Sequence, residues 1–137
     1  LRKCMTENLL PHRAGGVTRH QMLVGADKAI PPQAPLGRPR AQQSYGTDVA
    51  AVEAMPGAQC ELGGGLTEAM VRFAARHEYA RTVEDVLARR VRLLFLDARL
   101  AGLLAPQVGA ILAQEMGRDP EIEAFQALAA KYLLLPA

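Results

Sequence analysis

The chain has 137 residues, half of them apolar, and a formal net charge of +2. With 4% aromatic residues and no tryptophan, its core must be built from leucine, valine and alanine, which favours packed helices over a β-sandwich. The nearly balanced charge argues against a dedicated nucleic-acid binder, and no apolar run approaches the ~20 residues that a membrane-spanning helix requires.

Glycine and proline divide the chain into two unequal halves. Residues 1–65 hold nine of the twelve glycines and six of the nine prolines. Four of these prolines fall within Ala29–Arg40, which therefore cannot form a regular helix and is predicted to be an exposed, partly disordered linker. We expect an irregular leader over residues 1–43 and a helical domain over residues 44–137.

The first residues and the cysteines indicate the setting of the chain. It begins LRKCMTENLL, without the charged-then-apolar order of an export signal, and its opening leucine suggests a piece of a longer protein. Cys4 and Cys60 lie far apart in the less structured half. A single possible pair makes no disulfide framework, so we expect a reduced, cytoplasmic chain.

The first helices are predicted from turn residues and apolar spacing. Tyr45-Gly46-Thr47 reads as a turn followed by a capping threonine, and the helix after it ends at Pro56-Gly57. After the glycine run Gly63–Gly65, Thr67 is placed to cap a second helix, with Glu68 and Arg72 paired on its outer side. The predicted inner positions of these two helices are Val49, Val52 and Met55, and then Met70, Phe73 and Ala74.

A third helix is predicted to begin at Thr82. Asp85 stands three residues later, where its carboxylate can return to the Thr82 backbone and complete a capping box. Apolar residues follow at 3.6-residue spacing and predict one continuous core-facing stripe. The stripe consists of Val83, Val86, Leu87, Val91, Leu94 and Phe95.

Three further helices complete the prediction. Asp97 is placed to cap a short helix, Pro106 to open another that ends at Gly117, and Asp119-Pro120 to begin the last. The last helix is lined by Ile122, Phe125, Leu128, Ala129 and Tyr132, and no alternating strand pattern stands out. The predicted fold is all-α, a small bundle of four to six helices with an irregular, Pro/Gly-rich N-terminal leader.

The segment RHEYARTVEDVLARR, Arg76–Arg90, concentrates charge in an otherwise plain chain. Asp85 and Arg89 stand four residues apart, the spacing of a solvated salt bridge on a helix. Arg90 falls on the apolar side of the predicted stripe, where an unpaired charge is costly, and Glu78 is its natural partner. The simpler interpretation is that these arginines form structural ion pairs within the domain. The alternative is that they contact a ligand or another protein directly.

Other chemical readings of the polar residues lack supporting motifs. His77 beside Glu78 invites an acid–base role, yet no nucleophile motif or phosphate-binding glycine loop accompanies it. Cys4, His12 and His20 match no compact zinc spacing. A DNA-recognition helix over Thr82–Arg99 would interleave acids with its basic residues and has no preceding helix at helix-turn-helix spacing. From the residues alone, the chain is a helical module without a complete active site.

The run LTEAMVRFAARHEYARTVEDVLARRVRLLFLDARLA resembles the C-terminal cap domain of FAD-dependent glycerol-3-phosphate dehydrogenases and α-glycerophosphate oxidases. The turn Ser44–Thr47, the closing EIEAFQALAAKYL and, more loosely, the opening LRKCMTE also fit. The sequence departs from the family pattern by an extra residue at Cys4 and by the glycine run Gly63–Gly65. By this resemblance, residues 1–43 combine the tail of a flavin domain with the linker, and residues 44–137 form the cap domain.

The resemblance implies a parent flavoprotein that oxidises sn-glycerol 3-phosphate to dihydroxyacetone phosphate, with FAD as hydride acceptor and quinone as electron acceptor. FAD and the catalytic residues would belong to a missing N-terminal domain, so this chain is expected to bind no cofactor and to be inactive alone. The implied partners are that flavin domain, a possible second copy, and a membrane met peripherally at its inner, cytoplasmic face. Candidates for structural or domain contacts are Arg76, His77, Glu78, Thr82, Asp85, Arg89 and Arg90. An independent helical protein-interaction module is the alternative function.

Overall fold

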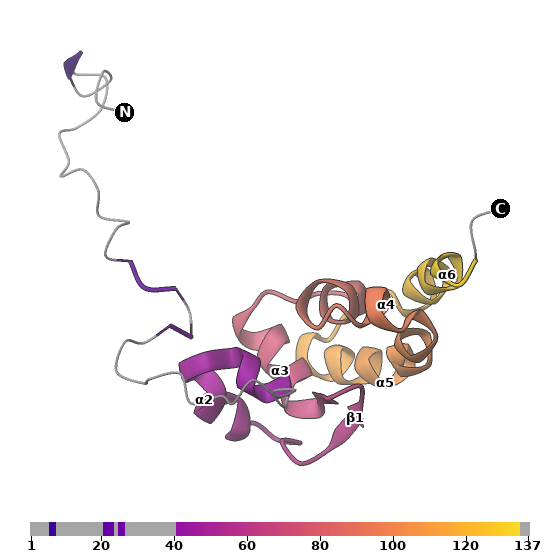
Figure 1. Ribbon diagram of the computed structural model, residues 1–137, viewed down its shortest axis with the longest axis horizontal. Helices are drawn as coiled ribbons and strands as arrows, with labels where there is room; N and C mark the ends of the chain where they lie inside the picture. The colour runs from indigo at the N-terminus through magenta and orange to yellow at the C-terminus, as the bar shows by residue number, and fades with distance from the viewer. Residues whose placement is uncertain (1–5, 8–20, 24, 27–40, 135–137) are drawn as a thin grey trace.

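A computed structural model describes residues 6–7, 21–23, 25–26 and 41–134 of the chain. In this part the protein is mostly helical, as predicted, and the helices surround one apolar core (Figure 1). The leader and linker assignments, together with Cys4, His12 and His20, fall wholly or mainly outside the described residues. Most of the described residues therefore belong to the region from Ala41 onward.

The folded region opens with a tight helical turn, η2 (Ala41–Asp48), and the short helix α2 (Val49–Glu53). Gly46 interrupts η2 with φ 57° and ψ −124°, which agrees with the predicted turn. The residue before α2 is Asp48 rather than the predicted cap Thr47, and its side chain makes no capping bond. Thr47 instead donates its backbone N–H to the carbonyl of Gly25 at 3.0 Å, and this bond ties a leader residue to the domain.

A two-stranded antiparallel sheet, β1 (Glu61–Gly63) and β2 (Leu66–Thr67), precedes α3 and was not predicted. Its turn is formed by Gly63, Gly64 and Gly65, all with positive φ, a conformation that glycine adopts without steric cost. The strands have three and two residues, too few for an alternating pattern to show in the sequence. The glycine run that departs from the family pattern is therefore a hairpin turn.

Helix α3 (Glu68–His77) confirms the sequence prediction closely. Thr67 caps it by accepting a hydrogen bond from the backbone N–H of Met70 at 3.4 Å. The predicted inner positions Met70, Phe73 and Ala74 are buried. The helix packs against α2 and against the later helix α5 (Ala98–Met116), so it lies near the centre of the fold.

The helix predicted from Thr82 is shorter and less regular than expected. After Val83 and Glu84 it becomes the π-helix η3 (Asp85–Arg90), in which Val91 donates to the carbonyl of Val86 at 3.0 Å. Arg92 then takes a left-handed conformation with φ 56°, and α4 (Leu93–Leu96) begins after it. The expected continuous stripe is therefore broken: Leu94 remains buried but Phe95, the last residue of that stripe, is 55% exposed.

Helix α5 (Ala98–Met116) corrects the predicted break at Pro106, because the proline lies inside one continuous 19-residue helix. A proline there leaves the carbonyl four residues earlier, that of Gly102, without its helical donor. The side chain of Gln126, in the last helix α6 (Ile122–Tyr132), donates a hydrogen bond to this carbonyl at 3.5 Å. The predicted ends are confirmed: Asp97 caps the helix through Leu100 N at 2.9 Å, and Gly117 ends it with φ 65°.

The last helix, α6 (Ile122–Tyr132), begins two residues later than Asp119-Pro120 predicted. Asp119 accepts from the backbone N–H of Glu121 at 2.9 Å and so forms a turn, and Pro120 offers its carbonyl to Val83 N at 2.9 Å. A Cβ at Gly109 would lie 2.4 Å from Ile122, so this glycine lets α5 and α6 approach closely. Phe125 and Ala129 are buried as expected, whereas Tyr132 is half exposed.

Candidate functional site

The capping box predicted at Thr82 and Asp85 is present. Thr82 Oγ1 accepts from Asp85 N at 3.2 Å, and Asp85 Oδ2 accepts from Thr82 N at 3.1 Å and Arg81 N at 2.9 Å. Burial of this half-buried carboxylate works against its charge, but the hydrogen bonds from Arg81, Thr82 and Arg89 together hold the pKa of Asp85 below its usual value. Asp85 therefore serves as an acceptor that fixes the start of the helix.

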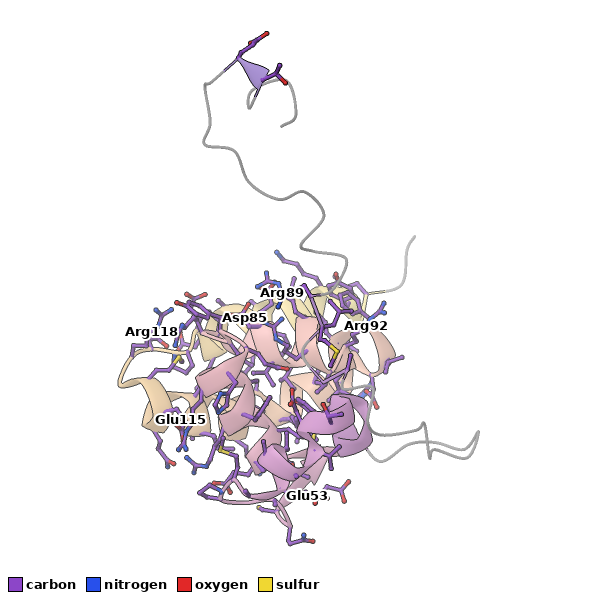
Figure 2. All side chains as sticks on the ribbon, turned by 90° about the vertical axis from the view of Figure 1, so that its left-hand side faces the viewer. Glu53, Asp85, Arg89, Arg92, Glu115 and Arg118 are labelled. Carbon is purple, nitrogen blue, oxygen red and sulfur yellow. The ribbon has the colours of Figure 1, made fainter. Side chains whose placement is uncertain are left out.

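Arg89 occupies the solvated side of this segment, as the spacing predicted. Its guanidinium binds Asp85 Oδ1 and also Glu84 Oε1, the latter at 2.7 Å, and its side chain is more than half exposed. Figure 2 shows Asp85 and Arg89 close together on one edge of the domain, with Arg92 further along. Arg92 lies beyond the end of η3, where the chain takes a left-handed conformation.

Arg90 pairs with Glu78, as the sequence suggested. Its guanidinium donates to the Glu78 backbone carbonyl, and its Nε lies 3.3 Å from Glu78 Oε2. Oε2 is buried and accepts no hydrogen bond from the described residues, so burial raises the pKa of Glu78 while Arg90 opposes the rise. The Arg90 side chain is about one-third exposed, so it is less deeply buried than its position on a regular helix implied.

Tyr45, in the first turn of the domain, lies close enough to this pair to feel both charges. Its ring meets Phe73 edge-on at 5.3 Å between centroids. Burial, reinforced by the Glu78 carboxylate and opposed by Arg90, raises the pKa of Tyr45 to about 12. The phenol is therefore held neutral at physiological pH, next to a carboxylate that is itself harder to ionise than usual.

His77 and Tyr79 lie at the surface, on either side of Glu78. The imidazole of His77 is exposed and stacks on Phe73 at 4.7 Å between ring centroids. Tyr79 has φ 61°, an uncommon conformation for a non-glycine residue. The Arg81 guanidinium lies over its ring in a cation–π contact, with Cζ 4.7 Å from the ring centroid. No hydrogen bond orients the imidazole of His77 among the interactions of the described residues, so the pairing that a general base requires is not formed there.

Arg76 belongs to a second cluster that sequence reasoning missed. Its Nε lies 2.6 Å from Glu115 Oε2, and Arg72 Nη1 lies 2.5 Å from Glu115 Oε1. Arg72 also binds Glu68, the predicted i,i+4 partner. The Glu115 side chain is only 9% exposed, and Arg76, with help from Arg72 and against the cost of burial, lowers its pKa to about 2. No local spacing connects residues 39 and 43 positions apart.

Six of the seven candidate residues thus divide between two structural clusters, and His77, whose ring stacks on that of Phe73, belongs to neither. The first cluster fixes the η3 segment and consists of Glu78, Thr82, Asp85, Arg89 and Arg90. In the second cluster, Arg76 joins α3 to the end of α5. Within the described part of the chain, no three His, Cys, Asp or Glu side chains gather to hold a metal ion. No helix among those residues is long and apolar enough to cross a bilayer. The arrangement defines a helical domain braced by ion pairs around a leucine- and alanine-rich core.

Comparison with known proteins identifies this type of domain. A family model, described as the C-terminal domain of alpha-glycerophosphate oxidase, matches residues 16–123, and the chain belongs to that family. It is 43% identical over 53 residues to the mitochondrial glycerol-3-phosphate dehydrogenase of Schizosaccharomyces pombe, covering 39% of this chain and 8% of the relative. It is 48% identical over 50 residues to a probable mitochondrial glycerol-3-phosphate dehydrogenase of Caenorhabditis elegans, covering 36% and 7%. No solved structure matches significantly.

Proposed function

We propose that the chain is the C-terminal domain of an FAD-dependent enzyme that oxidises sn-glycerol 3-phosphate to dihydroxyacetone phosphate and passes the electrons to quinone. The family match over residues 16–123 carries this proposal. The matched segments span less than a tenth of the dehydrogenases that the chain resembles. The activity therefore belongs to a parent protein of which this chain is a small part.

Within that parent, the domain is non-catalytic and serves to cap or assemble the flavin-bearing part. Within the Arg76–Arg90 segment, Glu78 pairs with Arg90, Asp85 with Thr82 and Arg89, and Glu84 with Arg89, while Arg76 pairs with Glu115 of α5. A dinucleotide site needs a glycine loop between a strand of a parallel sheet and a helix. The glycine run here, Gly63–Gly65, instead turns an antiparallel hairpin. The described residues therefore do not fit FAD, and the cofactor is assigned to the rest of the parent.

The setting proposed for the parent is the inner, cytoplasmic face of the cytoplasmic membrane. A quinone acceptor requires contact with a bilayer. The relatives named above carry the word mitochondrial in their names, which supports association with a respiratory membrane. The cytoplasmic face remains a prediction.

The test is glycerol-3-phosphate oxidation with a dye acceptor, measured on the full-length parent and on a version that ends before Ala41. The cut is placed there because α2 packs on α3 and β1 on α5, so a later cut would divide one folded unit. Turnover by the full-length protein is expected. Loss of turnover after truncation, with FAD retained, assigns the domain to ordering the substrate site, and unchanged turnover assigns it to assembly. A full-length protein that fails to oxidise glycerol 3-phosphate contradicts the proposal.

An independent interaction module is the second candidate function, and one observation favours it. Three large apolar side chains are exposed to solvent on α4 and α5, namely Phe95, Leu96 and Leu103. Exposed large apolar side chains that gather on one face mark contact surfaces.

A further inference from the structure

A turn from the first half of the chain is attached to the start of the folded domain through its backbone. Ala26 N–H donates to the Leu23 carbonyl at 3.0 Å and closes the turn, and the Gly25 carbonyl accepts from Thr47 N–H of η2 at 3.0 Å. The side chain of Leu23 is 79% exposed, so apolar burial of this side chain does not hold the turn in place. Backbone groups hold it instead.

Two glycines make this attachment possible, and neither position tolerates a side chain. A Cβ at Gly25 would lie 2.6 Å from the carbonyl oxygen of Tyr45, and a Cβ at Gly46 would overlap the carbonyl oxygen of Gly25. Both glycines also have positive φ, 76° and 57°. The obstructing atoms belong to the backbone and cannot rotate away as the end of a side chain can. We call this close approach of Gly25 to residues 45–47 the glycine contact.

The turn is attached to a firmly held part of the domain. The ring of Tyr45, whose carbonyl faces Gly25, meets the ring of Phe73 edge-on at 5.3 Å between centroids. Phe73 is 4% exposed and belongs to the core side of α3. Because η2 also packs against α2, the glycine contact fixes the turn to the core of the domain rather than to a loose end.

The glycine contact bears on the proline-rich residues 27–40, which the sequence alone predicts to be a linker. A free chain of that length could hold its two ends roughly 45–50 Å apart. Here the residue before the segment, Ala26, follows Gly25, and the residue after it, Ala41, opens η2. Since Gly25 is hydrogen-bonded to Thr47 of η2, the segment leaves and rejoins the domain at the same turn.

We propose that the glycine contact makes the turn closed by Leu23 and Ala26 part of the folded domain, so that residues 27–40 connect two points of one domain and do not link two domains. The family match begins at residue 16 and so includes the turn, which agrees with this assignment. The inference does not depend on the proposed function, because it concerns only contacts within this chain. In a longer protein, any tether to a preceding domain would lie before Leu23.

Amide hydrogen exchange at Thr47 tests the glycine contact. The rate is followed by NMR in the unaltered chain and in Gly25→Ala, whose added Cβ would meet the Tyr45 carbonyl. The Thr47 amide is expected to exchange at least about tenfold faster in the variant, because its acceptor, the Gly25 carbonyl, is displaced. The amides of α3 should exchange equally in both proteins, since the core stays folded. Equal rates for Thr47 would overturn the proposal.

The matched control is Gly117→Ala. Gly117 also has a positive φ, 65°, but no heavy atom lies within 4 Å of the position of its Cβ. Alanine there strains the backbone at the end of α5 without a clash, so Thr47 should stay as protected as in the unaltered chain. If Gly117→Ala accelerates exchange at Thr47 as much as Gly25→Ala does, general destabilisation explains the effect and the proposal is wrong.

Distances between two spin labels test the role of the proline-rich segment. The labels are placed at Met22→Cys and Lys131→Cys, both exposed, after the native cysteines are replaced by serine. With Gly25 intact, one narrow distance distribution is expected, and it should broaden when Gly25→Ala is added. A broad distribution in both proteins would show that the turn is not held on the domain and that the segment is a linker. A narrow distribution in both would overturn the glycine contact as the cause.

Discussion

Replacing Glu115 by glutamine should destabilise the fold, because this carboxylate joins two helices distant in sequence. Glu115 stands at the end of α5 and receives hydrogen bonds from Arg72 and Arg76, both on α3. Its side chain is largely covered. Glutamine keeps the size of the side chain but removes the negative charge, so Arg76 loses its carboxylate partner and Arg72 keeps only the carboxylate of Glu68.

The magnitude follows from the pKa of Glu115. A fall from 4.5 to about 2 corresponds to roughly 3 kcal/mol of favourable interaction in the folded state. Arg76 remains half in solvent, and ion pairs near the surface are weakened by screening, so the measurable loss should be about 1–2 kcal/mol. For a folded region of this size, such a loss lowers Tm by roughly 5–10 °C.

Urea denaturation at pH 7 and at pH 3 measures the effect. The folded pKa lies below the unfolded one, so the stabilisation is fully present above about pH 4.5 and is lost as pH falls toward 2. The difference between Glu115→Gln and the unaltered chain should therefore shrink at pH 3. Glu53→Gln, an exposed carboxylate with no ion pair among the described residues, should change little at either pH. A Glu115→Gln variant as stable at pH 7 as the unaltered chain would refute the reasoning.

Four further substitutions test the remaining contacts. Arg90→Ala leaves the Glu78 carboxylate and carbonyl without their partner and should cost about 1–3 kcal/mol in urea denaturation at pH 7, whereas Arg89→Ala, on the solvated side, should cost under about 1 kcal/mol. Thr82→Ala removes the acceptor for Asp85 N and should cost about 1 kcal/mol; no loss would mean that Asp85 alone holds the helix start. Ultraviolet titration should show a tyrosine with a pKa of about 12, absent in Tyr45→Phe. Because this pKa is raised on folding, the contribution of Tyr45 to stability is complete below about pH 10 and is lost as pH rises through 12.

The sequence predicted the ends of several helices correctly, because the capping residues that mark these ends lie next to the helix itself. Thr67, Asp97 and Gly117 all end or begin helices as their residue types indicate, and the Thr82–Asp85 capping box is present. The Arg90–Glu78 pair was also predictable, because an arginine on an apolar stripe needs a nearby acceptor.

The predictions that were wrong depend on contacts between helices. Pro106 reads as a helix start, but Gln126 of a neighbouring helix satisfies the carbonyl that the proline frees, so α5 continues through it. The Glu115 cluster joins residues about 40 positions apart and leaves no local signature. The π-helix and the left-handed Arg92 changed the direction of Phe95, which a regular 3.6-residue spacing assigns to the core.

The flavin content of three purified proteins shows which part of the parent holds the cofactor. They are the full-length parent, this chain alone, and the parent ending before Ala41, each purified and scanned for flavin absorbance. The account predicts FAD in the full-length and truncated proteins and none in this chain, with glycerol-3-phosphate oxidation in the full-length protein. Stoichiometric flavin bound to this chain alone would contradict the assignment of the cofactor to the rest of the parent, and with it the non-catalytic role of the domain.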